Sequence, residues 1–384
     1  MNFEFATATR IVFGTGAVRQ VGANVKNFGR RALVVTGARP ERAEKLLASL
    51  TASGISTAVF SVAGEPDIAT VERGVAFAKA EQCEFVVSIG GGSVIDAGKA
   101  IAAMMTNEGA LMDYLEVVGL GKTLTRRSAP FIAIPTTAGT GAEVTRNAVL
   151  SSPKDGVKVS LRSPLMLPEV AVVDPELTYH LPPALTASTG MDALTQLIEP
   201  YVCLRANPIT DGFCTTGIYW AARSLRTAVL HGEDDSARET MALASLSGGL
   251  ALANAGLGAV HGFAAVIGGQ FSAPHGAVCA ALLPHVMAVN IRALQERGGL
   301  NYAVVRYQRV AAMLTGNQNA TPEEGAEWVR QLVAELPIPR LAKHGIAEKH
   351  FTDLVAKAAK ASSMKANPLV LAPEELKEIL QRAL

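Results

Sequence analysis

The chain has 384 residues, of which 49% are hydrophobic, and its 35 Lys and Arg balance its 34 Asp and Glu to a net charge of +1. This composition is typical of a soluble protein of two domains. Nucleic-acid binding is not expected, because phosphate contacts need clustered basic residues. Four cysteines without a CxxC pair favour a reduced cytoplasmic setting, and the N-terminus does not resemble an export signal.

The first half of the chain alternates apolar β-branched runs with helical patterns, which is typical of βαβ units around a parallel sheet. The predicted strands are residues 32–36, 57–61, 85–89, 131–134 and 170–173, and the predicted helices are 41–53 and 71–81. Pro182 and Pro183 then break the pattern. We therefore predict a domain boundary near residue 180.

The second half consists of Ala- and Leu-rich segments with helical spacing. They cover residues 184–202, 209–230, 236–253 and 302–314. The sequence thus predicts an α/β domain over 1–180 and an all-helical domain over 181–384. Residues 240–291 contain no charged side chain, but polar residues such as Asn254 and Gln270 interrupt them, which favours buried helices around a polar site over a membrane span.

Glycines 90–92 and Ser93 lie between a predicted strand and a predicted helix. Glycines let the backbone approach a ligand, and free N–H groups at a helix start attract phosphate. The alternative is a capping box between Ser93 and Asp96 that needs no ligand. By contrast, Gly14 and Gly16 lack a third glycine at dinucleotide spacing, so we interpret them as a turn.

Two further groups of polar residues could bind ligands. Residues 135–143 crowd threonines and glycines into one loop after a strand, and could hold a second part of a polar cofactor or be an ordinary loop. In the second half, Asp192 and Gln196 share one helical face, while His261 and His275 lie in the uncharged stretch beside glycines. These four could bind a divalent metal, or the histidines could be hydrogen-bonded core residues.

The ordered combination of motifs is more specific than any one of them. It comprises residues 90–99 (GGGSVIDAGK), 135–143 (PTTAGTGAE), 174–178 (DPELT), 190–194 (GMDAL), 207–208 (NP), 258–262 (GAVHG) and 274–276 (PHG). From about residue 10 to its end, the chain resembles the iron-containing (group III) alcohol dehydrogenase family. The resemblance implies a Rossmann-like NAD(P)-binding domain, a helical domain and a metal in the cleft between them.

The resemblance also implies an activity and its residues. The activity is hydride transfer between NAD(P) and a small alcohol or its aldehyde or ketone, in a homodimer or larger homo-oligomer. The implied cofactor residues are Gly91, Gly92, Ser93, Asp96, Thr136, Thr137, Thr140 and Lys158. The implied metal ligands for Fe²⁺ or Zn²⁺ are Asp192, the residue at 196, His261 and His275, and Asp192, His261 and His275 would act in catalysis through the metal.

The chain departs from the family at several positions. Residue 196 is usually His, and the amide oxygen of Gln196 is a poorer donor for iron or zinc than an imidazole. Ala265 stands where many members carry a proton-relaying His, so the proton would pass through water, a ribose hydroxyl or another side chain. Cys279 lies one turn after His275 and can face the same site, although we favour an inert buried thiol.

A further departure concerns the choice of cofactor. NAD-preferring members often carry Asp at the position of Gly37 to bind the adenosine ribose. Without that carboxylate nothing repels a 2′-phosphate, and Arg39, with Arg42 as a second candidate, could pair with it. The sequence therefore favours NADP(H) slightly, although Arg39 could also be an ordinary surface residue.

Three alternatives to a metal-dependent dehydrogenase stay open. In the first, Gln196 does not bind metal at all, as in the metal-free maleylacetate-reductase branch of the superfamily. A lyase of the dehydroquinate-synthase type would need basic residues in the helical half, and residues 240–291 have none. A non-catalytic cofactor-binding protein would explain the loss of two histidines, but it would not explain why Asp192, His261 and His275 are retained.

Overall fold

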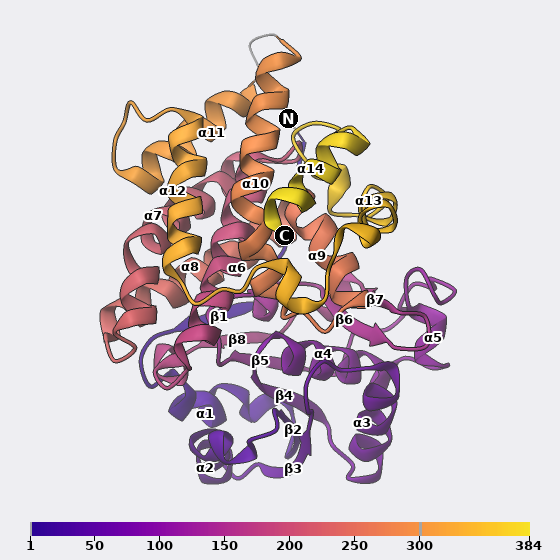
Figure 1. Ribbon diagram of the computed structural model, residues 1–384. Helices are drawn as coiled ribbons and strands as arrows, with labels where there is room; N and C mark the ends of the chain where they lie inside the picture. Colours follow the sequence, from indigo (N-terminus) through magenta and orange to yellow (C-terminus); the bar gives the residue numbers. More distant parts are fainter. Residues whose placement is uncertain (1, 299–301) are drawn as a thin grey trace. The chain divides into compact units, whose positions relative to one another are not determined.

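The computed structural model describes residues 2–298 and 302–384, and these form two compact units. The N-terminal α/β unit contains residues Ala6–Thr137 and Gly141–Tyr179. The helical unit contains His180–Leu384, together with Ala138–Thr140 and the N-terminal segment through Phe5. The predicted architecture, a Rossmann-like α/β part followed by an all-helical part, is confirmed (Figure 1).

The N-terminal α/β unit is built on a six-stranded parallel sheet with the strand order β1-β8-β5-β4-β2-β3. Its strands are β1 (Arg10–Phe13), β2 (Arg31–Thr36), β3 (Ser56–Ser61), β4 (Phe85–Gly90), β5 (Phe131–Pro135) and β8 (Val170–Val173). Its helices are α1 (Val21–Val25), α2 (Glu44–Ala52), α3 (Ile68–Ala80), α4 (Gly92–Thr106) and α5 (Leu111–Tyr114). A separate antiparallel hairpin joins β6 (Asn147–Ser152) to β7 (Val157–Arg162).

Both faces of the parallel sheet are covered by helices. Leu33 and Val35 of β2 belong to a core with residues of α3 and α4, whereas Ala32 and Val34 belong to a second core with residues of α1 and α2. The helices that cover the sheet are seen in Figure 1. Burial on both faces explains why these strands are continuous apolar runs and could be predicted from sequence. The sequence did not predict β1, β6 and β7, because these short segments contain polar residues and become strands only by pairing.

The helical unit is built around its long apolar helix α10. Its helices are α6 (Pro183–Val202), α7 (Pro208–Leu230), α8 (Asp235–Asn254), α9 (Ala259–Gln270), α10 (His275–Glu296), α11 (Tyr302–Thr315), α12 (Pro322–Glu335), α13 (Phe351–Ala358) and α14 (Pro373–Ala383). Helices α6, α9, α12 and α14 pack on α10 (Figure 1). Among the described helices α10 alone is long and apolar enough to cross a membrane by composition, and 83% of that stretch is buried here.

Local sequence signals set the helix boundaries in this unit. Asn207 caps α7 by accepting a hydrogen bond from the N–H of Thr210, and Pro208 follows at the first helical position. Asp234 caps α8 in the same way through the N–H of Ala237. Helices α8 and α9 together are apolar enough to resemble a span, but they are bent by 95° at the break between them. The uncharged stretch therefore consists of packed core helices.

A buried lysine holds the loop after β5 against α4. Lys99 is fully buried, and its ammonium group donates hydrogen bonds to the carbonyl oxygens of Ala142 (2.8 Å) and Asn147 (2.8 Å) and to Thr145 Oγ1 (3.0 Å). Burial lowers the pKa of Lys99 to about 8, while the charges of Asp96 and Glu143 oppose this shift. Burial also raises the pKa of nearby Glu143 to about 7.

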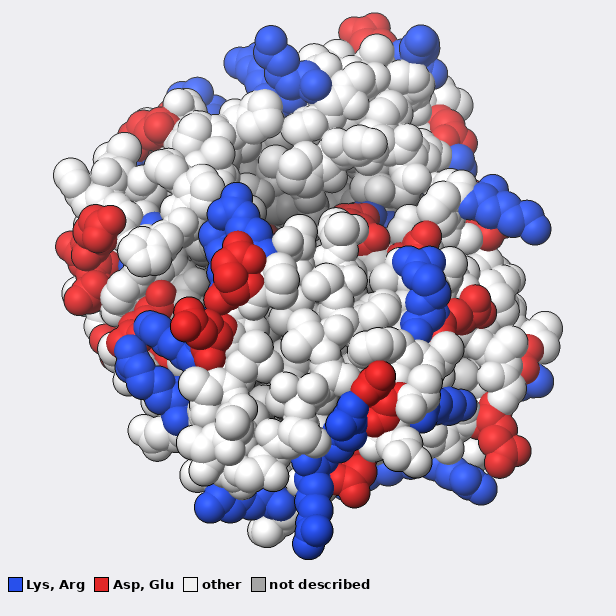
Figure 2. All heavy atoms as spheres, turned by 90° about the horizontal axis from the view of Figure 1, so that it is seen from below, with Lys and Arg blue, Asp and Glu red and all other residues white. Residues whose placement is uncertain are grey.

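Charged side chains are interspersed on the molecular face shown in Figure 2. Lys and Arg alternate there with Asp and Glu, in keeping with a net charge of +1. Elsewhere in the chain, charged residues form ion pairs, such as Arg19 with Glu176 and Arg226 with Glu335.

Replacing Lys99 by Met should loosen the loop after β5. The three oxygen atoms would lose a charged donor, at a cost of about 3 kcal/mol. Amide hydrogen exchange in residues 142–147 should accelerate by up to about 100-fold, because this free energy equals roughly two powers of ten. The exposed Lys79, replaced by Met, is the control. Unchanged exchange in Lys99→Met would show that the lysine does not hold the loop.

Candidate metal centre and cofactor edge

The cofactor-binding residues expected from the sequence gather largely at one edge of the parallel sheet. Thr36 of β2 is paired with Ile89 of β4, and Gly90 at the end of β4 is paired with Pro135 of β5. Gly37, residues 91–93 and Thr136–Thr137 directly follow these strand ends. The chain leaves β2 toward β3 and leaves β4 toward β5, so the strand order reverses between β2 and β4. Ligands of open α/β sheets bind at such a switch point.

The start of α4 has the features of an anion site. Gly91 is its N-cap and no side chain caps it, so the capping box between Ser93 and Asp96 is not formed and that alternative is wrong. Asp96 Oδ2 instead accepts a hydrogen bond from the N–H of Val149 (3.1 Å). A Cβ on Gly90 would lie 2.5 Å from Val94 Cβ, whereas one on Gly91 would meet only Thr137, at 3.7 Å. Packing thus requires Gly90, but it leaves space at Gly91.

The remaining expected cofactor residues have other surroundings. Lys158 lies on β7, where its ammonium forms an ion pair with Glu65 at 2.5 Å. Thr140 belongs to the short segment Ala138–Thr140, which clusters with the helical unit. Arg39 is exposed just after β2, and it pairs with none of the acidic side chains in the described part of the chain. Gly14 and Gly16 form a turn, as expected, after β1.

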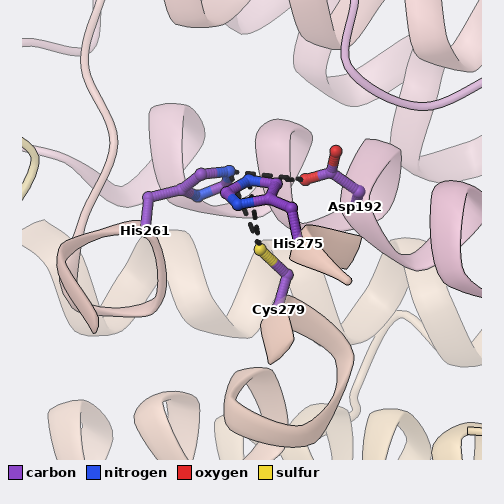
Figure 3. A group of neighbouring side chains, drawn as sticks. All are labelled: Asp192, His261, His275 and Cys279. Atoms are coloured by element: carbon purple, nitrogen blue, oxygen red, sulfur yellow. Dashed lines mark hydrogen bonds and ion pairs between the residues drawn. The ribbon is translucent and has the colours of Figure 1, made fainter. Parts of the chain in front are cut away.

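Four side chains of the helical unit converge on one point. The ligand atoms of Asp192, His261, His275 and Cys279 all lie within 4.8 Å of one another (Figure 3). Asp192 Oδ1 is 3.4 Å from His261 Nε2 and 3.7 Å from His275 Nε2. Three helices supply these groups: α6 carries Asp192, α9 carries His261, and α10 carries His275 and Cys279.

Glycines at the starts of α9 and α10 allow this convergence. A Cβ on Gly276 would lie 2.3 Å from the carbonyl oxygen of Ser188, so only glycine lets the start of α10 pack against α6 one turn before Asp192. A Cβ on Gly258 would lie 2.8 Å from Glu199 Oε1, so glycine at the N-cap of α9 lets this helix approach Glu199. Helix packing therefore requires glycine at position 276, and glycine at position 258 leaves room for the Glu199 carboxylate.

Glu199 orients His261 through Nδ1, the ring nitrogen that does not face Asp192. Its Oε2 is 2.6 Å from His261 Nδ1, and its Oε1 accepts a hydrogen bond from the N–H of Val260 (2.7 Å) at the start of α9. A carboxylate only accepts hydrogen bonds, so Nδ1 carries a proton, and in the neutral form of the ring Nε2 keeps its lone pair free for a metal ion. Sequence analysis missed Glu199, although its position seven residues after Asp192 places it on the same helical face.

Two buried oxygen atoms in the cluster lack hydrogen-bond partners. Asp192 and Gln196 are 2% and 3% exposed, and neither Asp192 Oδ1 nor Gln196 Oε1 has a donor. Buried polar atoms without partners are costly, and such a group indicates an absent ion. A carboxylate, two imidazoles and a thiol within 4.8 Å suit a divalent transition metal, so the residues fit a metal ion.

The charged groups of the cluster shift one another's pKa toward the charged forms. Burial alone would raise the pKa of Asp192, but the charges of His275 and His261 hold that pKa below its usual value. Burial would also raise the pKa of the Cys279 thiol, yet the charges of His275 and His261 lower it. Conversely, burial disfavours charged His261, but the Cys279 and Glu199 charges raise its pKa well above the usual range.

Cys279 is buried, as we expected, and it also faces the cluster, which the sequence had left open. Its Sγ is 3.7 Å from His275 Nε2 and 4.0 Å from His261 Nε2, and the side chain points at both rings (Figure 3). Ala265, one turn after His261, is exposed on α9. The spacing of four residues between His275 and Cys279 was the sequence signal for their shared helical face.

Comparisons with known proteins agree with this geometry. The sequence profile "Iron-containing alcohol dehydrogenase" matches residues 8–175, and the C-terminal profile of the Fe-containing alcohol dehydrogenase family matches residues 186–384. Alcohol dehydrogenase 4 of Schizosaccharomyces pombe is 37% identical over 97% of this chain and 87% of its own length. An NAD-dependent methanol dehydrogenase of Bacillus methanolicus is 36% identical over 97% of both chains.

Solved structures give the same result over the whole chain. The crystal structure of a 1,3-propanediol oxidoreductase superposes with a TM-score of 0.91 at 36% identity and covers 100% of both chains. Similarity at this level extends through the α/β and the helical parts alike. The chain therefore belongs to the iron-containing alcohol dehydrogenase family, and it is a metal-dependent NAD(P)-linked oxidoreductase that interconverts a small alcohol and its carbonyl compound.

Proposed function

We propose that Asp192, His261 and His275 hold the divalent ion, Fe²⁺ or Zn²⁺, and act in catalysis through it. The observation that carries this proposal is the convergence of their ligand atoms around the orphaned Asp192 Oδ1. When bound, such an ion supplies Lewis acidity toward the oxygen of the alcohol or carbonyl substrate. Two side chains compete for the fourth protein position: the amide oxygen of Gln196, expected from the family, and the thiol of Cys279.

The residues around the ion have separate roles in this proposal. Asp192 supplies negative charge, and the two imidazoles supply neutral nitrogen donors. Glu199 is a positioning residue, because it fixes the tautomer and orientation of His261 without reaching the other three ligands. Ala265 offers no titratable group, so the proton of the alcohol leaves through water or a cofactor hydroxyl.

We also propose that residues 1–180 bind the cofactor and that residues 181–384 bind metal and substrate. The phosphates would lie at Gly91, Gly92 and Ser93, because the N–H groups of Gly92 and Ser93 precede the first hydrogen bonds of α4, which Val94 and Ile95 donate to the carbonyl oxygen of Gly91. Asp96, Thr136, Thr137, Thr140 and Lys158 complete the expected cofactor set. For Asp96 the role would be indirect, since its carboxylate already binds the backbone of β6.

In this proposal, the residues expected at the adenosine end of the cofactor favour NADP(H) over NAD. Gly37 places no carboxylate after β2, and the unpaired Arg39 is exposed two residues later. We further propose a cytoplasmic homodimer or larger homo-oligomer. Four free cysteines fit a reducing compartment, and exposed Leu204, Leu230 and Val370 offer apolar surface on the helical unit for association.

Replacing Asp192 by Asn should abolish metal binding with little change in shape. Loss of the ion should lower kcat/KM at least about 100-fold for 1,3-propanediol or methanol as substrate, because Lewis acidity contributes several kcal/mol. Metal content by elemental mass spectrometry and cofactor absorbance measure both effects, with the exposed Asp235→Asn as control. Full activity of wild-type protein after complete removal of metal would instead indicate a metal-free reductase.

Replacing Glu199 by Gln should weaken metal binding without removing a ligand. The imidazole of His261 would lose its charged hydrogen-bond partner, and the affinity for Zn²⁺ should fall about 10- to 100-fold. Competition against a chelator of known affinity measures the dissociation constant. Glu239→Gln, on the exposed side of α8, serves as the matched control. Equal affinities of wild type and Glu199→Gln would contradict the positioning role.

Replacing Gly37 by Asp should shift the cofactor preference toward NAD. A Cβ there meets only Val94 Cγ2 at 3.8 Å, so the carboxylate fits. Its repulsion of a 2′-phosphate should lower the ratio of kcat/KM for NADP to that for NAD by at least about tenfold. Arg39→Ala should lower the NADP value alone. If both variants keep the wild-type ratio, Gly37 and Arg39 do not determine the preference between NADP and NAD.

A further inference from the structure

The thiol of Cys279 occupies the position of a metal ligand. Cys279 is fully buried, yet its Sγ faces the two imidazole nitrogens that also face Asp192 (Figure 3). The other three cysteines are free and none joins a comparable group of donors in the described residues. Close to this thiol, the buried oxygens Asp192 Oδ1 and Gln196 Oε1 have no hydrogen-bond donor. The thiol is therefore one of several donor atoms that surround a candidate metal position.

The distances between donors match those of a tetrahedral site. With Zn–N near 2.05 Å and Zn–S near 2.3 Å, a nitrogen and a sulfur on one tetrahedral ion lie about 3.6 Å apart, and an oxygen and a nitrogen about 3.4 Å apart. The Sγ of Cys279 is 3.7 and 4.0 Å from the two Nε2 atoms. Asp192 Oδ1 is 3.4 and 3.7 Å from the same atoms. The four donors thus stand nearly at ligand spacing.

Helix geometry and charge also favour the thiolate over the amide. His275 and Cys279 are four residues apart on α10, so both donors project from one helical face. Asp192 alone would leave a divalent ion with a buried net charge of +1, whereas a thiolate brings the site to neutrality and so lowers the cost of burial. Gln196 brings no charge, and it interacts with Asp192 instead.

We infer that Cys279 binds the metal ion as a thiolate and is the fourth protein ligand, with Gln196 supporting Asp192 rather than the ion. The inference rests on the proposed metal-dependent function and changes its ligand set to Asp192, His261, His275 and Cys279. On binding, one S–H bond breaks, one S–metal bond forms, and the proton is released to solvent. Four protein donors leave the substrate a fifth position, a coordination number that catalytic zinc sites reach.

A thiolate ligand has a spectroscopic signature that is independent of activity. Metal-free protein is loaded with Co²⁺ under anaerobic conditions, and cobalt content is measured by elemental mass spectrometry. Wild-type protein should show an intense thiolate-to-cobalt charge-transfer band in the near ultraviolet at one cobalt per chain. Cys279→Ser and Cys279→Ala should lose the band and bind Co²⁺ at least about tenfold more weakly, since even partners beyond the ligands contribute that much.

Two variants serve as controls. Cys214→Ser removes another fully buried thiol of the helical unit, on α7, and should keep the band. Gln196→Ala tests the competing fourth ligand and should keep the band as well. Stoichiometric cobalt in wild type without a charge-transfer band, or a band that persists in Cys279→Ser, would overturn the inference and leave the proposed function standing. Wild-type protein that binds no cobalt would overturn both.

Discussion

The burial of the Asp192 carboxylate among helices is the constraint on which the functional site depends. A carboxylate that is 2% exposed with an unpartnered oxygen is tolerated only beside compensating positive charge. The two imidazoles face this carboxylate from α9 and α10, and in our proposal a divalent ion between them supplies the positive charge. The same dry surroundings would strengthen the interaction of that ion with a substrate oxygen.

Small residues make this burial possible. Gly276 lets α10 begin against the backbone of α6, and Gly258 lets α9 begin against Glu199. Each of these helix starts presents a histidine. A backbone contact with α6 therefore positions His275, and the Glu199 carboxylate positions His261. A side chain at Gly276 would separate α10 from α6 and enlarge the spacing of the donors.

The α/β unit shows the same principle with a different polar group. Lys99 is buried in α4 and binds the loop after β5, while Gly90 and Gly98 allow α4 to lie close to β4 and its neighbours. These contacts fix the strand ends at which the cofactor residues gather. In the α/β unit, buried Lys99 therefore positions a loop through backbone carbonyl oxygens. In the helical unit, buried Glu199 positions the start of α9 and the imidazole of His261.

The sequence by itself determined the fold class, the family and most members of the site, because apolar periodicity and motif spacing are local properties. It could not rank the interpretations of Gln196 and Cys279, since both are single polar residues in apolar helices. It also could not find Glu199, whose role depends on the start of α9, 61 residues away. Only tertiary packing brings α6, α9 and α10 to one point, and this contact decided which side chains face the metal position.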